Sequence, residues 1–178
     1  YKVLPGQGKY FDPQFREKGK GPWRRNVVQH KGHSSDVITD IALEWFAKHR
    51  KAETPFFMML HYKAPHDMFE YAPRYESYLA DTEIPEPESL YWQPRFGSVA
   101  TRGKNNTMRD RIGTSVSKRH PYRNYGQDFH IDPNLPDKEY THQAYQVYLK
   151  KSLRCVKGVD DTLARLFGSL REQGLMDN

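Results

Sequence analysis

The chain has 178 residues, a net charge of +6 and a mean hydropathy of -0.93, so it is long enough for one domain but polar for a compact one. Twelve glycines and twelve prolines indicate much loop surface, which favours a piece of a larger domain over a small domain with long ordered loops. No apolar stretch approaches the roughly 18 residues of a membrane span and no signal peptide opens the chain, which excludes a transmembrane segment here. The positive charge favours an anionic partner, such as nucleic acid, anionic lipid or sulfated glycan, without choosing among them.

The first helix is predicted to follow an irregular segment. Residues 1–33 are rich in glycine, proline and basic residues without sustained periodicity. Capping oxygens at Ser34-Ser-Asp36 then precede apolar residues at helical spacing. These apolar residues are Val37, Ile38, Ile41, Ala42, Trp45 and Phe46. Asp36 and Asp40 are interpreted as first-turn acids that favour the helix dipole rather than as metal ligands.

An unbroken apolar run follows the helix. Residues 56–60 are too few for a helix and suit a strand that is buried on both faces of a mainly parallel sheet. Pro65 cannot continue a strand ladder, so the chain is predicted to turn there. In open α/β sheets ligands bind beyond the carboxyl ends of the strands, which makes Tyr62, Lys63 and His66 candidate site residues.

Three segments together resemble a known family. Pro55-Phe-Phe-Met-Met-Leu-His-Tyr-Lys-Ala-Pro-His66, followed by Ala72-Pro-Arg-Tyr75, resembles the central strand and following loop of the type I sulfatases, relatives of alkaline phosphatase. Residues 4–13 resemble the segment before that strand, and residues 148–178 resemble the long helix after it. The resemblance implies that residues 1–178 are the central part of a sulfatase catalytic domain. The implied fold is α/β, part of an alkaline-phosphatase-like sandwich of a mainly parallel sheet with flanking helices and long loops.

The same resemblance implies an activity and a site. A sulfuric ester hydrolase would release sulfate from a sulfated small molecule or glycan, with carbohydrate preferred over aryl sulfate as the substrate. His66 is the predicted catalytic residue, and Lys63 and His66 are the predicted substrate-binding residues. Calcium and a formylglycine nucleophile are expected, but no metal ligand is predicted within this chain. Sulfatases of this kind suggest a periplasmic, extracellular or lysosomal location.

The sequence explains why the family's nucleophile and calcium ligands are not expected within this chain. Cys155 is the only cysteine, and it lies in a helical pattern as an ordinary buried thiol rather than in the family's Cys/Ser-x-Pro-x-Arg motif. Asp160 and Asp161 fall in mid-helix, so they are not the family's paired calcium ligands.

The remaining chain is predicted to be a long loop and a long helix. Residues 67–136 carry many prolines and little periodicity beyond a short helix near residues 75–80. Within them, residues 102–125 hold seven basic residues against one acid, which suits either the binding of an anionic polymer or a solvated lid. Apolar residues recur at three- and four-residue steps from about Asp137, with a possible bend at Gly158 and a glycine cap at Gly174.

Two other functions are compatible with these patterns. One is a phosphodiesterase-type member of the alkaline phosphatase superfamily, which the Lys63-Ala-Pro-His66 pattern disfavours. The other is a non-catalytic polyanion-binding module that uses the basic loop, although no nucleic acid partner is expected.

Overall fold

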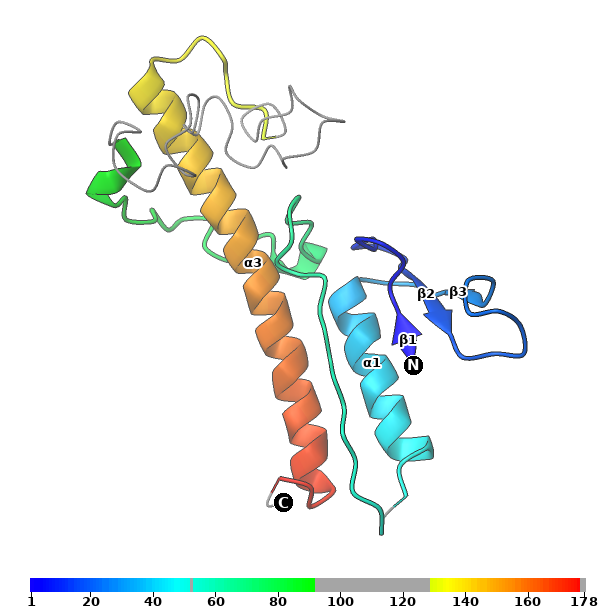
Figure 1. The fold of residues 1–178 in the computed structure, drawn as a ribbon. Helices are drawn as coiled ribbons and strands as arrows, with labels where there is room; N and C mark the ends of the chain where they lie inside the picture. The colour runs from blue at the N-terminus through cyan, green and yellow to red at the C-terminus, as the bar shows by residue number, and fades with distance from the viewer. Residues whose placement is uncertain (52, 92–128, 177–178) are drawn as a thin grey trace. The chain divides into compact units, whose positions relative to one another are not determined.

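The computed structural model describes residues 1–51, 53–91 and 129–176 (Figure 1). These residues form two compact units, the first made of Tyr1–Ser77 with Leu153–Asn178 and the second of Tyr78–Ser152. The long helix α3, Asp137–Glu172, contributes its first part to the second unit and its remainder to the first. No helix in the described part of the chain is long and apolar enough to cross a membrane.

Three short strands form an antiparallel sheet in the first unit. They are β1 (Lys2–Val3), β2 (Gln14–Glu17) and β3 (Val27–Gln29), in the order β1-β2-β3. Phe15 of β2 is 3% exposed and packs with Val37 and Ile38, whereas its neighbour Gln14 is exposed. The prediction that residues 1–33 are irregular is therefore wrong for these strands, because runs of two to four residues are too short to show an alternating pattern.

The predicted first helix is confirmed as α1, Ser34–Lys48, and its apolar side packs on the sheet and on α3. Its cap differs from the prediction, because His33 Nδ1 accepts a hydrogen bond from the Ser35 amide at 3.3 Å. The hydroxyls of Ser34 and Ser35 are instead buried without a hydrogen-bond partner among the described residues. Histidine can cap a helix when its unprotonated ring nitrogen faces the first turn, as it does here.

The apolar run after α1 is extended, but the prediction that it forms a strand of a parallel sheet is wrong for the described chain. Residues 55–63 belong to no strand, and the described strands pair only in the antiparallel sheet. The run lies between α1 and the end of α3 (Figure 1), where Met58 and Leu60 pack against Phe46 and Leu166. Phe57 and Met59 point the other way and are 85% and 66% exposed. A strand exists only when a second backbone pairs with it, and no described segment does so.

The predicted long helix is confirmed as α3, which ends as the sequence indicates. Gly174 has a φ of +66°, and its amide donates to Arg171 O at 3.0 Å while the Leu175 amide donates to Leu170 O at 2.9 Å. This pair of bonds is the Schellman cap, for which glycine is the favoured residue. Gly158 has a packing role, because a Cβ atom there would lie 3.2 Å from the Tyr75 ring. Cys155 is buried in this helix, as predicted.

The described parts of residues 67–136 contain only two short 3₁₀ helices, η1 (Pro73–Tyr75) and η2 (Glu88–Tyr91), so the predicted short helix near residues 75–80 is reduced to η1 and turns. In the second unit, η2 and the chain before it pack on the start of α3. The Gln146 side chain there bonds both backbone groups of Ile84, each at 2.8 Å. The predicted basic loop, residues 102–125, lies outside the described residues.

Candidate functional site

The candidate site is built on the turn that follows the extended run. The His66 amide donates to Lys63 O at 2.9 Å, and the Ala64–Pro65 peptide bond within this turn is cis. The predicted reversal at Pro65 is therefore present. It brings Lys63 and His66 to the wall of one pocket.

His66 is oriented by the residue that follows it. Its Nδ1 contacts the Asp67 carboxylate and lies 2.7 Å from the Asp67 carbonyl oxygen, so the proton on Nδ1 has two acceptors. The imidazole is 44% exposed, and Nε2 has no partner in the described part of the chain. A neutral ring with its proton on Nδ1 presents Nε2 as a proton acceptor, and a protonated ring presents it as a donor. The ring is thus available to an oxygen of a bound ligand.

Tyr10 holds the backbone of the turn at His66. It is 2% exposed, and its hydroxyl donates to the carbonyl oxygen of His66. Burial raises the pKa of Tyr10 far above its ordinary value, and the nearby Cys155, Glu70 and Asp67 raise it further. The phenol therefore stays protonated at neutral pH and keeps donating to the turn.

Lys63 lies close to His66 and contacts the N-terminal loop. Its ammonium donates to Gln7 O at 3.0 Å and sits 4.8 Å from the centre of the Tyr10 ring. Burial lowers the pKa of Lys63, while Asp67 and Glu70 act in the opposite direction. A partly buried ammonium attracts an anion more strongly than an exposed one, because less water screens it.

His33 ties the loop after His66 to the start of α1. Its Nε2 donates to Glu70 O at 2.9 Å while Nδ1 caps α1, so both ring nitrogens are used. Its ring packs edge-on against Phe11, with the ring centres 5.3 Å apart. Sequence reasoning missed both His33 and Tyr10 as supports of the site. The only signal was a histidine directly before the Ser-Ser-Asp cap, which local patterns do not connect with residues 66–70.

The next residues are anchored to both helices of the first unit. Arg74 forms two bonds with the Asp36 carboxylate, at 2.8 and 2.7 Å, and this pairing raises the pKa of Arg74. Tyr75 donates to Asp161 at 3.0 Å. These acids are therefore engaged with protein donors. Among the described residues, no group of three or more His, Cys, Asp or Glu side chains is arranged to hold a metal.

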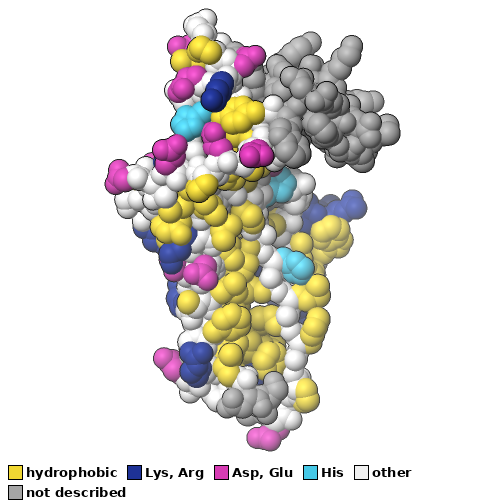
Figure 2. Space-filling view, turned by 90° about the vertical axis from the view of Figure 1, so that its left-hand side faces the viewer, with side chains coloured by type: hydrophobic (Ala, Val, Ile, Leu, Met, Phe, Trp, Pro, Cys, Tyr) yellow, Lys and Arg dark blue, Asp and Glu magenta, His cyan; other side chains and the backbone are white. Residues whose placement is uncertain are grey.

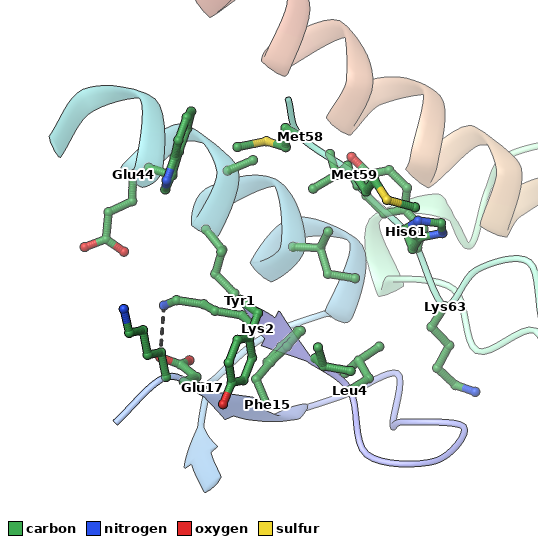
Figure 3. Close-up of a pocket in the computed structure, with 18 of the residues that line it drawn as sticks. Tyr1, Lys2, Leu4, Phe15, Glu17, Glu44, Met58, Met59, His61 and Lys63 are labelled. Atoms are coloured by element: carbon green, nitrogen blue, oxygen red, sulfur yellow. Dashed lines mark ion pairs between the residues drawn. The ribbon is translucent and has the colours of Figure 1, made fainter. Parts of the chain in front are cut away.

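The pocket beside the turn has a volume of about 1140 Å³ and a mostly apolar wall. It lies between the N-terminal chain, β2, α1 and residues 57–66. Figure 3 shows Lys63 at one end and Glu44 at the other, with Leu4, Phe15 and Met58 between them. A sulfate or carboxylate would find no donor along the apolar part, whereas Lys63 and His66 offer an ammonium and an imidazole at one end. Lys2, Lys18 and His49 also line the pocket, and Lys2 is paired with Glu17 at 3.2 Å. Figure 2 shows that hydrophobic side chains also gather in a long band on one face.

The turn after the extended segment presents an ammonium and an imidazole to one pocket, and such a pair of groups can bind an oxoanion. The chain belongs to the sulfatase family, because the family model described as Sulfatase matches residues 5–178. This confirms the family resemblance and places the chain within part of a sulfatase catalytic domain.

Two relatives give the likeness more detail. The chain is 29% identical to an N-acetylglucosamine-6-O-sulfatase of Bacteroides thetaiotaomicron over an alignment that covers 100% of the chain and 37% of the relative. It is also similar to a solved structure of BT4656 in complex with its substrate D-glucosamine-2-N,6-O-disulfate, with 27% identity and a TM-score of 0.76. That match covers 99% of this chain and 41% of the other. The chain therefore spans about two fifths of the length of these relatives.

Proposed function

We propose that this chain forms part of a sulfuric ester hydrolase that releases sulfate from a sulfated carbohydrate. Family membership supports the reaction class, and the two relatives, which by name and bound substrate act on sulfated glucosamine, support the substrate. The observation that carries the proposal is the placement of His66, held by Asp67 with Nε2 available, beside Lys63. The comparisons favour this function over the phosphodiesterase alternative.

His66 and Lys63 have complementary proposed roles. Cleavage of a sulfate ester leaves negative charge on the departing sugar oxygen and on the sulfate oxygens. A protonated His66 would donate from Nε2 to the departing oxygen or to the sulfate, while Asp67 keeps the ring in place through Nδ1. Lys63 would offset the sulfate charge from the same wall of the pocket.

The described residues do not fit the calcium ion or the formylglycine that the family implies. No cluster of metal-ligating side chains is present among them, and Cys155 is 1% exposed within α3 rather than open to a substrate. We therefore assign both groups to other parts of the complete protein and route no step through them here.

The test uses the intact protein and replaces one imidazole. His66→Ala is expected to lower kcat/KM for release of sulfate from N-acetylglucosamine 6-sulfate by roughly 10² to 10³, the usual cost of losing one donor to developing charge. His130→Ala is the matched control, because His130 is an exposed histidine that does not line the pocket. Unchanged kcat/KM in His66→Ala would refute the assignment of His66. Faster turnover of an aryl sulfate than of the sulfated sugar would refute the carbohydrate assignment.

A further inference from the structure

The loop between β2 and β3 concentrates positive charge on the first unit. We call residues 16–25 the basic hairpin, because they hold five basic side chains against the single acid Glu17. The basic residues are Arg16, Lys18, Lys20, Arg24 and Arg25, of which all but Arg16 are exposed. Glu17 is already engaged with Lys2 at 3.2 Å and with His30 at 2.8 Å. Most of the positive charge of the hairpin is therefore left to face solvent.

The basic hairpin has a defined shape. The Asn26 side chain donates to Gly21 O at 2.9 Å, and the Arg25 amide donates to Pro22 O at 2.8 Å. Gly19 lies so close to Asn26 that a Cβ atom there would be 2.8 Å from its side chain, so the loop closes tightly around this amide. Figure 1 shows the loop extending away from α1. The backbone of the loop is thus held by its own hydrogen bonds while its basic side chains face solvent.

Trp23 arranges two of these charges. The indole is 50% exposed, and the guanidinium carbons of Arg16 and Arg24 lie 4.7 and 5.4 Å from its ring centre. Cation–π attraction at these distances restricts both guanidinium groups without neutralising them.

We propose that the basic hairpin binds a sulfated polysaccharide chain. Guanidinium groups pair with two oxygens of an oxoanion at once, and the lysines add point charges along the same loop. Proteins that bind single-stranded nucleic acid use open aromatic faces for base stacking, whereas the Trp23 ring is engaged by guanidinium groups. The hairpin contains neither Lys63 nor His66, although its Lys18 lines the same pocket. Its binding does not require that the protein hydrolyse a sulfate ester.

The test measures binding by the intact protein with a fluorescently labelled heparin-type octasaccharide, by anisotropy at several salt concentrations. Affinity is expected to fall steeply as salt rises. Binding releases the small cations that surround the sulfated chain, and added salt opposes that release. A hairpin variant that loses three charges is expected to bind at least about tenfold more weakly. It carries Lys20→Gln, Arg24→Gln and Arg25→Gln and keeps Lys18, which lines the pocket.

A matched variant loses the same number of charges elsewhere. It carries Lys51→Gln, Lys138→Gln and Arg171→Gln, all at exposed positions outside the hairpin. It is expected to retain nearly all of the affinity. Equal weakening in the two variants would overturn the proposal, because only net charge would then matter.

Trp23 provides a second test at constant charge. Trp23→Ala is expected to weaken binding several-fold, and Trp23→Phe to restore most of it, since a phenyl ring still attracts guanidinium groups. Equal affinity for the desulfated octasaccharide, or tighter binding of a single-stranded DNA of the same charge, would overturn the assignment to a sulfated polysaccharide. Release of sulfate from a monosaccharide, measured in parallel, is expected to be unchanged in the hairpin variant. A protein that binds the octasaccharide but releases no sulfate would contradict the proposed function and leave this inference standing.

Discussion

The backbone of His66 is held by Tyr10, and its ring is held by Asp67. The first contact fixes where the turn lies, and the second fixes which ring nitrogen faces the pocket. Neither partner is itself placed toward a substrate, so we regard both as positioning residues. A loss of either contact should therefore affect the site through the orientation of His66.

The buried Tyr10 is also expected to make the free energy of unfolding fall at alkaline pH. Its pKa is raised in the folded protein above the value of about 10 in an unfolded chain. A group with a raised pKa in the folded state contributes its full stability below the unfolded pKa, and that contribution is lost as pH rises beyond it. Above about pH 10, Tyr10 keeps its proton only in the folded state, so the unfolding free energy falls by about 1.4 kcal/mol per pH unit.

Tyr10→Phe is therefore expected to reduce the loss of stability between about pH 10 and 12 by up to that slope. At neutral pH it should cost about 1 kcal/mol, because one hydrogen bond to the turn is removed. Urea unfolding of the intact protein at a series of pH values measures both effects. Tyr78→Phe, at an exposed position, serves as the control. Parallel pH profiles for the wild type and Tyr10→Phe would contradict the role given to burial of this phenol.

Two glycines of α3 lie in different surroundings. The Tyr75 ring approaches Gly158, whereas a Cβ atom added at Gly168 would meet nothing within 4 Å. Glycine in a helix interior costs roughly 1 kcal/mol relative to alanine. A side chain at residue 158 would crowd the Tyr75 ring, which reaches Asp161 from that side.

The two glycines make a matched pair of substitutions. Gly158→Ala is expected to destabilise the protein by about 1 to 2 kcal/mol, since the new methyl group displaces the Tyr75 ring and outweighs the gain in helix propensity. Gly168→Ala in the same helix is expected to stabilise it by about 0.5 to 1 kcal/mol. Denaturant unfolding of both variants measures the difference. Stabilisation by both substitutions would show that Tyr75 moves aside freely.

The extended run of the first unit exposes large apolar side chains. Phe57 and Met59 of the extended run are the most exposed of the large apolar side chains in the described residues, and Phe56 adjoins them at 41%. Contiguous patches of this kind indicate a surface that another protein segment covers or a liability to aggregation.

Residues 1–178 produced alone are therefore expected to self-associate with increasing concentration and to bind a hydrophobic dye. Phe57→Ser combined with Met59→Ser should lower both signals, because the patch loses its two most exposed members. Met176→Ser is the control, since Met176 is also exposed but lies outside the run. Sedimentation velocity, dye fluorescence and circular dichroism of the helices measure the outcome. A monodisperse helical fragment that binds no dye would contradict this view of the patch.

Sequence alone determined the parts of this protein that depend on neighbours a few residues apart. The periodicity of α1 and α3, the cap at Gly174, the turn at Pro65 and the buried thiol of Cys155 all follow from spacing and residue type. The family was predictable for a related reason, because the order of several short motifs survives where no single motif is decisive.

Tertiary structure decided everything that joins distant segments. The hydrogen bond from Tyr10 to His66 spans 56 residues, and the one from His33 to Glu70 spans 37. No local sequence pattern predicts either bond. The apolar run of residues 56–60 shows the limit most clearly. Its composition correctly predicted an extended chain, but pairing into a sheet requires a second backbone with matching donors and acceptors, and only the folded arrangement determines whether one is beside it.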